Sequence, residues 1–204
     1  MGYGHMRAAR PLQVIAERGK IIPADDYEGI PRRDRLIWER SAKVYYFFSR
    51  LSDKGTLGNL IFRAFNHFQK IEDVEKKQTA PTLQLRQGYS LVRGGWGRNL
   101  IEKLNERPLP FITTFFTIGQ MAEVWGYRGE IYVMATDSDV SRAWAPLEPQ
   151  KSRIEYFAPT ETVQRHLENY GVRPEKIHLT GFPLPPDLVR DAKVGEGFVE
   201  ELVN

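Results

Sequence analysis

The chain of 204 residues carries 29 Lys and Arg against 26 Asp and Glu, and the resulting net charge of +3 is too small to indicate nucleic-acid binding. It contains no cysteine, which excludes disulfides and thiolate metal sites, and it has no run of about 20 apolar residues that would span a membrane. Hydrophobic residues make up 41% of the composition, enough for the core of one domain. Because the N-terminus lacks a signal-peptide pattern, the chain is predicted to be cytoplasmic.

A glycine loop, Gly2-Tyr3-Gly4-His5, stands at the N-terminus ahead of a helix predicted over 6–18. Pro11 marks either a kink in that helix or a later true start, and Gly19 ends it. A glycine loop that opens a helix normally follows a β-strand, so we expect the first strand to be missing from the chain. The loop does not fit the dinucleotide fingerprint G-x-G-x-x-G, because Arg7 occupies the position of its third glycine.

Residues 31–106 are predicted to form a helical insertion rich in aromatic and basic side chains, with helices over 31–51, 56–70, 82–93 and 98–106. Nine Lys and Arg lie between positions 32 and 70, against four Asp and Glu when Glu72 just beyond is included. Trp38, Tyr45 and Tyr46 fall outside the main apolar face of the first helix. Basic amphipathic helices with aromatic residues bind the interface of anionic membranes. Packing of this region on the protein core is the alternative.

From position 111 onward, short strands alternate with helices. Strands are predicted over 111–116, 130–135, 153–157 and 176–180, and helices over 118–127 and 161–170. This alternation predicts an α/β fold, a Rossmann-like parallel sheet with helices on both faces. Residues 186–204 are predicted to be a tail or linker.

Ligands of an open parallel sheet bind beyond the carboxyl ends of its strands. This rule selects the loops at 2–5, 117–119 and 136–144. His5, Asp137 and Asp139 are expected to meet at this rim, an arrangement suited to general-base chemistry. A plain turn role is the alternative for Asp139. The other histidines, His67, His166 and His178, show no metal-ligand spacing and are expected on the surface or in the core. No metal or cofactor is predicted.

Three segments in order resemble the N-terminal domain of GT-B glycosyltransferases. Residues 2–9 are similar to the family's G-x-G-H-x-x-A loop, and Thr136-Asp137, with Trp144 and Pro146 downstream, is similar to T-D-x-x-x-H-x-x-W. Residues 156–183, ending in Thr180-Gly181-Phe182-Pro183, resemble the family's strand–helix–strand that ends in T-G-I-P. The most similar members are monogalactosyldiacylglycerol synthases and bacterial processive diacylglycerol glucosyltransferases, with the peptidoglycan GlcNAc-transferase more distant. The family's histidine between T-D and W falls on Ser141 here.

The resemblance implies that residues 1–185 form an acceptor-side domain and that 186–204 lead toward a donor domain outside the 204 residues. It implies an inverting hexosyltransferase that moves a sugar from a nucleotide donor, a UDP-sugar, to the hydroxyl of a membrane lipid. The chain by itself would be inactive, and the enzyme would be peripheral at the membrane.

The resemblance also implies roles for individual residues. His5 would be the catalytic base or would position the acceptor, and Asp137 would orient His5 or hold the acceptor. The implied substrate-binding residues are Gly2, Gly4, Thr136, Asp139, Ser141 and Trp144, and the implied membrane or acceptor surface is Trp38, Tyr45 and Tyr46. Two alternatives stay open: a sugar-nucleotide epimerase that uses the same cleft, and a degenerate module that binds a lipid surface or a partner without catalysis.

Overall fold

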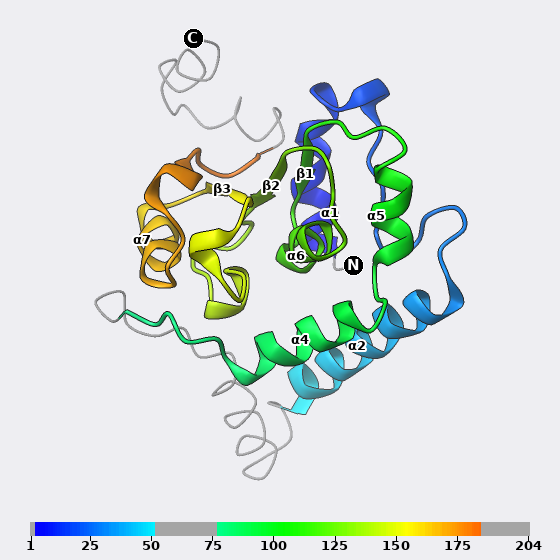
Figure 1. The fold of residues 1–204 in the computed structure, drawn as a ribbon, viewed down its shortest axis with the longest axis horizontal. Helices are drawn as coiled ribbons and strands as arrows, with labels where there is room; N and C mark the ends of the chain where they lie inside the picture. The colour runs from blue at the N-terminus through cyan, green and yellow to red at the C-terminus, as the bar shows by residue number, and fades with distance from the viewer. Residues whose placement is uncertain (1–2, 52–76, 185–204) are drawn as a thin grey trace.

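The computed structural model describes residues 3–51 and 77–184, without the side chains of residues 3 and 45–51. Gly2, the helix predicted over 56–70, the tail at 186–204 and the side chains of Tyr45 and Tyr46 therefore lie outside the described residues. The described part contains a four-stranded parallel sheet in the order β1-β2-β3-β4 (Figure 1), which confirms the predicted α/β fold. The strands are β1 (Phe111–Thr113), β2 (Ile131–Met134), β3 (Glu155–Ala158) and β4 (Ile177–Leu179).

Two helices connect neighbouring strands and pack on one face of the sheet. They are α6 (Phe116–Val124) between β1 and β2, and α7 (Glu161–Asn169) between β3 and β4. Because each strand pairs with the next one in sequence, two right-handed crossovers place both helices on the same side. Gly119 lets α6 approach β2 closely, since a Cβ at this position would lie 2.4 Å from Val133 Cγ2. The buried Ile131, Tyr156 and Ile177 fill this face.

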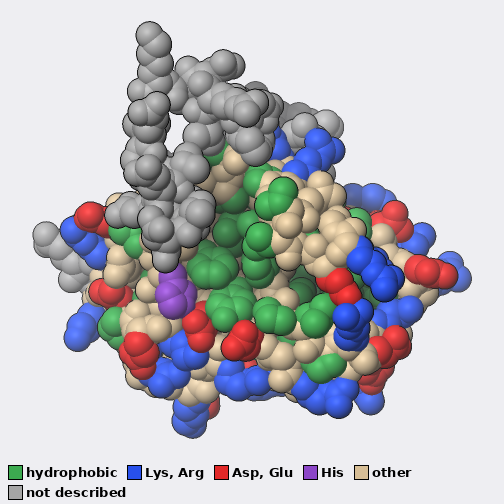
Figure 2. Space-filling view, turned by 90° about the horizontal axis from the view of Figure 1, so that it is seen from above, with side chains coloured by type: hydrophobic (Ala, Val, Ile, Leu, Met, Phe, Trp, Pro, Cys, Tyr) green, Lys and Arg blue, Asp and Glu red, His purple; other side chains and the backbone are tan. Residues whose placement is uncertain are grey.

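The alternate strand positions carry Tyr132, Phe157 and His178 on the opposite face. The rings of Tyr132 and Phe157 stack with centroids 5.2 Å apart, and His178 packs against Phe157 at 5.8 Å. Tyr132 and Phe157 are half-buried, and His178 is exposed. Figure 2 looks at the molecule from above and shows hydrophobic side chains gathered in a hollow between charged ones.

The N-terminal segment differs from the single helix predicted over 6–18. An α-helix, α1 (Tyr3–Ala9), is followed by two 3₁₀ turns, η1 (Arg10–Val14) and η2 (Glu17–Gly19). The prediction is wrong beyond Ala9 because Pro11, at the start of η1, has no amide hydrogen and its ring obstructs the preceding turn of an α-helix. The helix also begins earlier than expected, so His5 lies inside its first turn.

The described part of the insertion is helical. It comprises α2 (Arg32–Leu51), α4 (Leu83–Arg93) and α5 (Arg98–Leu104), and the side-chain oxygen of Thr82 caps the start of α4. The buried Asp34 carboxylate accepts a hydrogen bond from the Gly97 amide, which ties α2 to the turn between α4 and α5. Burial raises the pKa of this carboxyl above its usual value. No helix in the described ranges is long and apolar enough to cross a membrane.

Short 3₁₀ turns complete the connections around the sheet. They are η3 (Arg142–Trp144) and η4 (Pro149–Lys151) between β2 and β3, and η5 (Pro174–Lys176) before β4. The loop from β2 to η3, residues 135–141, is called the rim loop below because it lies at the carboxyl end of the sheet.

Candidate functional site

His5 lies against the carboxyl ends of β1 and β2. Its Nδ1 is 2.8 Å from the carbonyl oxygen of Thr114 and 3.3 Å from the hydroxyl of Thr136, while the Thr114 hydroxyl donates to the carbonyl of His5. A carbonyl oxygen only accepts, so Nδ1 must carry the proton that it donates to Thr114. In the neutral ring, Nε2 then keeps its lone pair and is able to take a proton.

An aromatic cluster packs around the imidazole. The ring of His5 meets Phe115 edge-on at 4.9 Å, Phe115 lies 6.0 Å from Trp38, and Trp38 lies 4.8 Å from Trp96. Trp38, which was expected on a membrane or acceptor surface, is therefore half-buried inside this cluster, as the core-packing alternative requires. The cluster joins α2 to the ring of His5.

A pocket of about 190 Å³ opens beside His5. Its walls come from all three motif segments, namely α1, the rim loop and the chain after β4; the lining residues are Gly4, Arg7, Ala8, Thr136, Phe182, Pro183 and Leu184. Arg7 is exposed and forms no hydrogen bond or ion pair with the described residues. Phe182, with 40% of its surface exposed, and Leu184 make the opposite wall apolar. The pocket thus offers a cation and an apolar surface; His5 itself does not line it, but Thr136, whose hydroxyl contacts His5 Nδ1, does.

The rim loop brings Thr136 to the site and leaves Asp137 close by, but it turns Asp139 away. Asp137 is exposed and has no hydrogen-bonding or ionic partner among the described residues. Asp139 instead accepts from His166 Nδ1 at 2.5 Å and from the amide of Val140 at 2.7 Å. The expectation that Asp139 would join His5 at the rim is therefore wrong, because a buried donor on α7 holds its carboxylate.

Two other residues predicted to bind substrate lie further along the same segment. Ser141 is half-buried and precedes η3. Trp144 is only 5% exposed; its ring packs 5.1 Å from Phe116, and its carbonyl accepts from the Tyr156 hydroxyl at 2.9 Å. In the structure Trp144 is a core residue and does not line the pocket.

Sequence reasoning missed two buried groups next to the site. His166 is 1% exposed and bonded to Asp139, whereas its sequence pattern indicated only surface or core placement. Its spacing from Val163 and Tyr170 on α7 puts it beside the apolar face of that helix, a signal that could have located it. Arg142 is fully buried, and no local pattern distinguishes it from the exposed arginines of this chain.

Comparisons with protein-family models, curated proteins and solved structures gave no match to this chain. Within residues 3–51 and 77–184, no group of three His, Asp or Glu side chains is placed to hold a metal ion. The function is therefore argued from the arrangement around His5.

Proposed function

We propose that this chain is the acceptor-side half of an inverting glycosyltransferase that moves a sugar from a UDP-sugar to a hydroxyl group of a membrane lipid. The observation that carries the proposal is the imidazole of His5, whose Nδ1–H donates to Thr114 and whose Nε2 is left as a base at the carboxyl rim of a parallel sheet. The three segments that resemble GT-B enzymes line one pocket beside it, which supports the same function.

In the proposed reaction, the acceptor oxygen attacks the anomeric carbon of the donor as the bond from that carbon to the nucleotide diphosphate breaks. The acceptor hydroxyl gives its proton to Nε2 of His5 in the same step, so the sugar is transferred with inversion. The resulting imidazolium is stabilised by the Thr114 carbonyl, which already accepts from Nδ1. The exposed carboxylate of Asp137, which has no hydrogen-bonding or ionic partner among the described residues, would accept a hydrogen bond from the acceptor.

The surroundings of the pocket suit an amphipathic acceptor. Phe182 and Leu184 give the pocket an apolar wall, and Arg7 adds a cation. On α2, Leu36 and Val44 are exposed on the same side as Arg40 and Lys43, since these positions repeat at helical spacing. A helix face of this composition binds the headgroup region of an anionic membrane, which would bring a lipid hydroxyl to the site.

The test is sugar transfer by the full-length protein from UDP-sugars to diacylglycerol in mixed micelles. We expect His5→Gln to lower kcat by about 10²–10⁴-fold, the usual contribution of a general base, with little change in the acceptor KM. His178→Gln is the matched control, because this imidazole is exposed on the opposite face of the sheet and pairs with Glu155. Near-normal turnover by a correctly folded His5→Gln variant would remove the catalytic assignment.

A non-catalytic lipid- or partner-binding module is the second candidate. It is favoured by Ser141, which stands where the resembling family has a histidine, and by the exposed side of α2. Such a module would bind anionic vesicles while the wild-type protein transferred no sugar from any UDP-sugar. The epimerase alternative predicts conversion of the UDP-sugar in the absence of any acceptor.

A further inference from the structure

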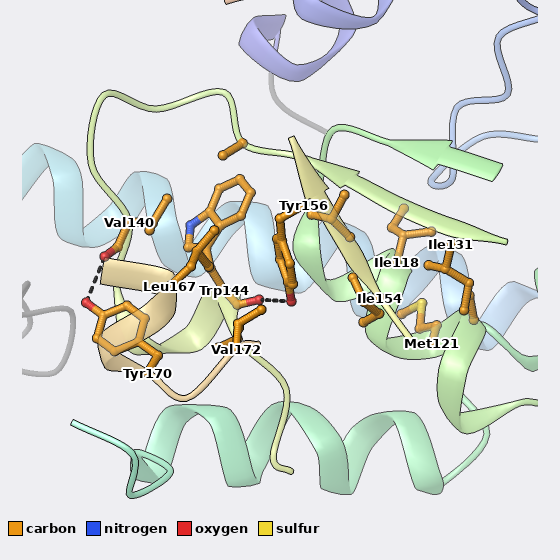
Figure 3. Packing of buried hydrophobic residues seen from close by; sticks show 14 of the residues in the cluster. Ile118, Met121, Ile131, Val140, Trp144, Ile154, Tyr156, Leu167, Tyr170 and Val172 are labelled. Carbon is orange, nitrogen blue, oxygen red and sulfur yellow. Dashed lines mark hydrogen bonds between the residues drawn. The ribbon is translucent and has the colours of Figure 1, made fainter. Parts of the chain in front are cut away.

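Three hydrogen bonds fasten the rim loop to α7 and the residues that cap its two ends. Each donor is a side chain, and the acceptors belong to three consecutive residues of the loop. The bonds run from Thr160 Oγ1 to Ser138 O at 3.1 Å, from His166 Nδ1 to Asp139 Oδ1 at 2.5 Å, and from Tyr170 Oη to Val140 O at 2.8 Å. Figure 3 shows the bond from Tyr170 to Val140 at one side of the core, beyond Leu167 and Trp144. These contacts are called the α7 clamp.

His166 makes the charge-assisted bond of the α7 clamp. The imidazole is 1% exposed and lies parallel to the ring of Tyr170, with centroids 5.7 Å apart. Its carboxylate partner, Asp139, also accepts from the Val140 amide, so one oxygen organises the turn of the loop. Hydrogen bonds to an ionised carboxylate are about twice as strong as neutral ones, and loss of the His166 donor would leave the Asp139 carboxylate with the Val140 amide as its remaining partner among the described residues.

The rim loop is also anchored on its other side. The amide of Ala135 donates to Phe157 O at 3.0 Å, which continues the pairing of β2 with β3. Only Thr136 and Asp137 lie between this anchor and the α7 clamp. The Ala135 bond fixes one end of this two-residue span, and the α7 clamp fixes the end that follows Asp137.

We propose that His166 is a positioning residue, whose bond to Asp139 holds Thr136 and Asp137 in place beside His5. The effect of this bond on catalysis rests on the proposed function, whereas its effect on the geometry of the rim loop does not. The assignment also explains why Asp139 is absent from the pocket, because its carboxylate is used to fix the loop that carries Thr136 and Asp137.

The first experiment measures how firmly the rim loop is held, and how it lies beside His5, in four variants. His166→Leu removes the donor, and His166→Asn keeps an N–H near the position of Nδ1. Tyr170→Phe removes a second bond of the α7 clamp but keeps the ring. Tyr127→Phe is the matched control, because this buried tyrosine also donates to a backbone carbonyl, that of Leu109 before β1, at the other end of the sheet. The readouts are deuterium exchange of residues 136–141 and the ring ¹⁵N resonances of His5.

We expect His166→Leu to raise exchange over 136–141 by about tenfold or more, as the loss of one charge-assisted hydrogen bond implies. The His5 resonances should shift, and His166→Asn should restore both properties toward wild type, while Tyr127→Phe changes neither. Unchanged exchange and unchanged His5 resonances in His166→Leu would overturn the proposal. If that variant does not fold, Tyr170→Phe decides: faster exchange confined to 136–141 supports the proposal, and its absence overturns it.

The second experiment measures sugar transfer by the full-length protein. A misplaced rim should lower kcat by about 10–100-fold in His166→Leu, and His166→Asn should recover most of the loss. If the rim loosens while kcat stays unchanged, the positioning role in catalysis is overturned. If the wild-type protein transfers no sugar, the proposed function fails, and the exchange and resonance measurements still decide whether the α7 clamp positions the rim.

Discussion

Three imidazoles of this protein are held by acceptors that fix which nitrogen carries the proton. His5 donates from Nδ1 to a carbonyl, His166 donates from Nδ1 to a carboxylate, and His178 donates from Nε2 to Glu155. Neither a carbonyl nor a carboxylate donates in return, so each neutral ring has one defined tautomer. The chemistry proposed for His5 depends on this assignment, because a neutral ring protonated at Nε2 would have no free nitrogen to accept the proton of an acceptor hydroxyl.

A long-range ¹H–¹⁵N spectrum at mildly alkaline pH tests the assignment directly. We expect His5 to show a protonated Nδ1 and an unprotonated Nε2, because Thr114 accepts at 2.8 Å from Nδ1. His178 serves as an internal control and should show the opposite pattern, since its Nε2 lies 2.8 Å from Glu155. A protonated Nε2 on His5 would contradict the proposed base.

Arg142 is the largest fully buried side chain in the part of the chain that the structure describes, and it has backbone carbonyls as partners. Its guanidinium donates to Thr79 O at 3.0 Å, to Ala145 O at 2.9 Å and to Pro146 O at 3.1 Å, which ties the segment before α4 to the segment after the rim loop. Burial lowers the pKa of this guanidinium. Several nearby tyrosine rings complete its surroundings.

Replacing Arg142 should destabilise the protein strongly. We expect Arg142→Ala to lower the free energy of unfolding by about 3 kcal/mol, because it leaves buried carbonyls without donors and creates a cavity. Arg165→Ala is the control: this exposed arginine pairs with Glu161 on the surface of α7, and its loss should change stability by less than about 1 kcal/mol. Urea denaturation followed by circular dichroism measures both. Equal effects of the two changes would show that the buried hydrogen bonds contribute little.

At the scale of elements, substitutions at two helical glycines with different surroundings distinguish the effect of helix propensity on stability from the effect of packing. Gly119 of α6 faces the sheet, where a Cβ would lie 2.4 Å from Val133, whereas a Cβ at Gly88 of α4 would meet nothing within 4 Å. We expect Gly119→Ala to lower the free energy of unfolding by about 2 kcal/mol through overpacking. Gly88→Ala should raise it by about 0.5–1 kcal/mol. Thermal melts of the two variants give the comparison, and a gain of stability in Gly119→Ala would contradict the close approach of α6 to β2.

The strands and helices after position 111 were predictable because each carries its own local pattern. The β-rich runs FITTFF, EIYVMA and KIHLT each contain an observed strand, although the strands are shorter than the runs. Phe116, for example, was placed in the first strand but begins α6, because a run of β-favouring residues does not mark where the chain leaves the sheet. Element type was thus readable, and element ends were not.

The site was predictable only as far as chain order and the strand-end rule reach. They placed Thr136 near His5, as the structure confirms. They failed for Asp139 because the direction of its carboxylate depends on His166, which is 27 residues away in the chain. They left Trp38 undecided because helical spacing alone does not report the contact with Trp96. Contacts between distant segments determine both outcomes.

At the scale of the whole molecule, the small net charge of +3 conceals an uneven surface. The exposed side of α2 combines Arg40 and Lys43 with Leu36 and Val44, and the aromatic cluster links this helix to His5 through Trp38 and Phe115. A membrane bound along α2 would therefore lie against the helix whose Trp38 packs on Phe115, the neighbour of the His5 ring. The membrane part of the proposal is open to a direct charge-reversal test.

We expect the protein to bind vesicles of phosphatidylcholine and phosphatidylglycerol at low salt, and Arg40→Glu with Lys43→Glu to weaken binding by about tenfold or more. Each cation near an anionic surface contributes about 1 kcal/mol, and the attraction is screened as the Debye length falls to about 3 Å in 1 M salt. The control reverses the same number of charges elsewhere, at Lys151 and Arg165, which are exposed on η4 and α7. Vesicle co-sedimentation measures both variants. Equal weakening by the two pairs would show a non-specific charge effect, and no binding by the wild-type protein would remove the membrane from the proposed function.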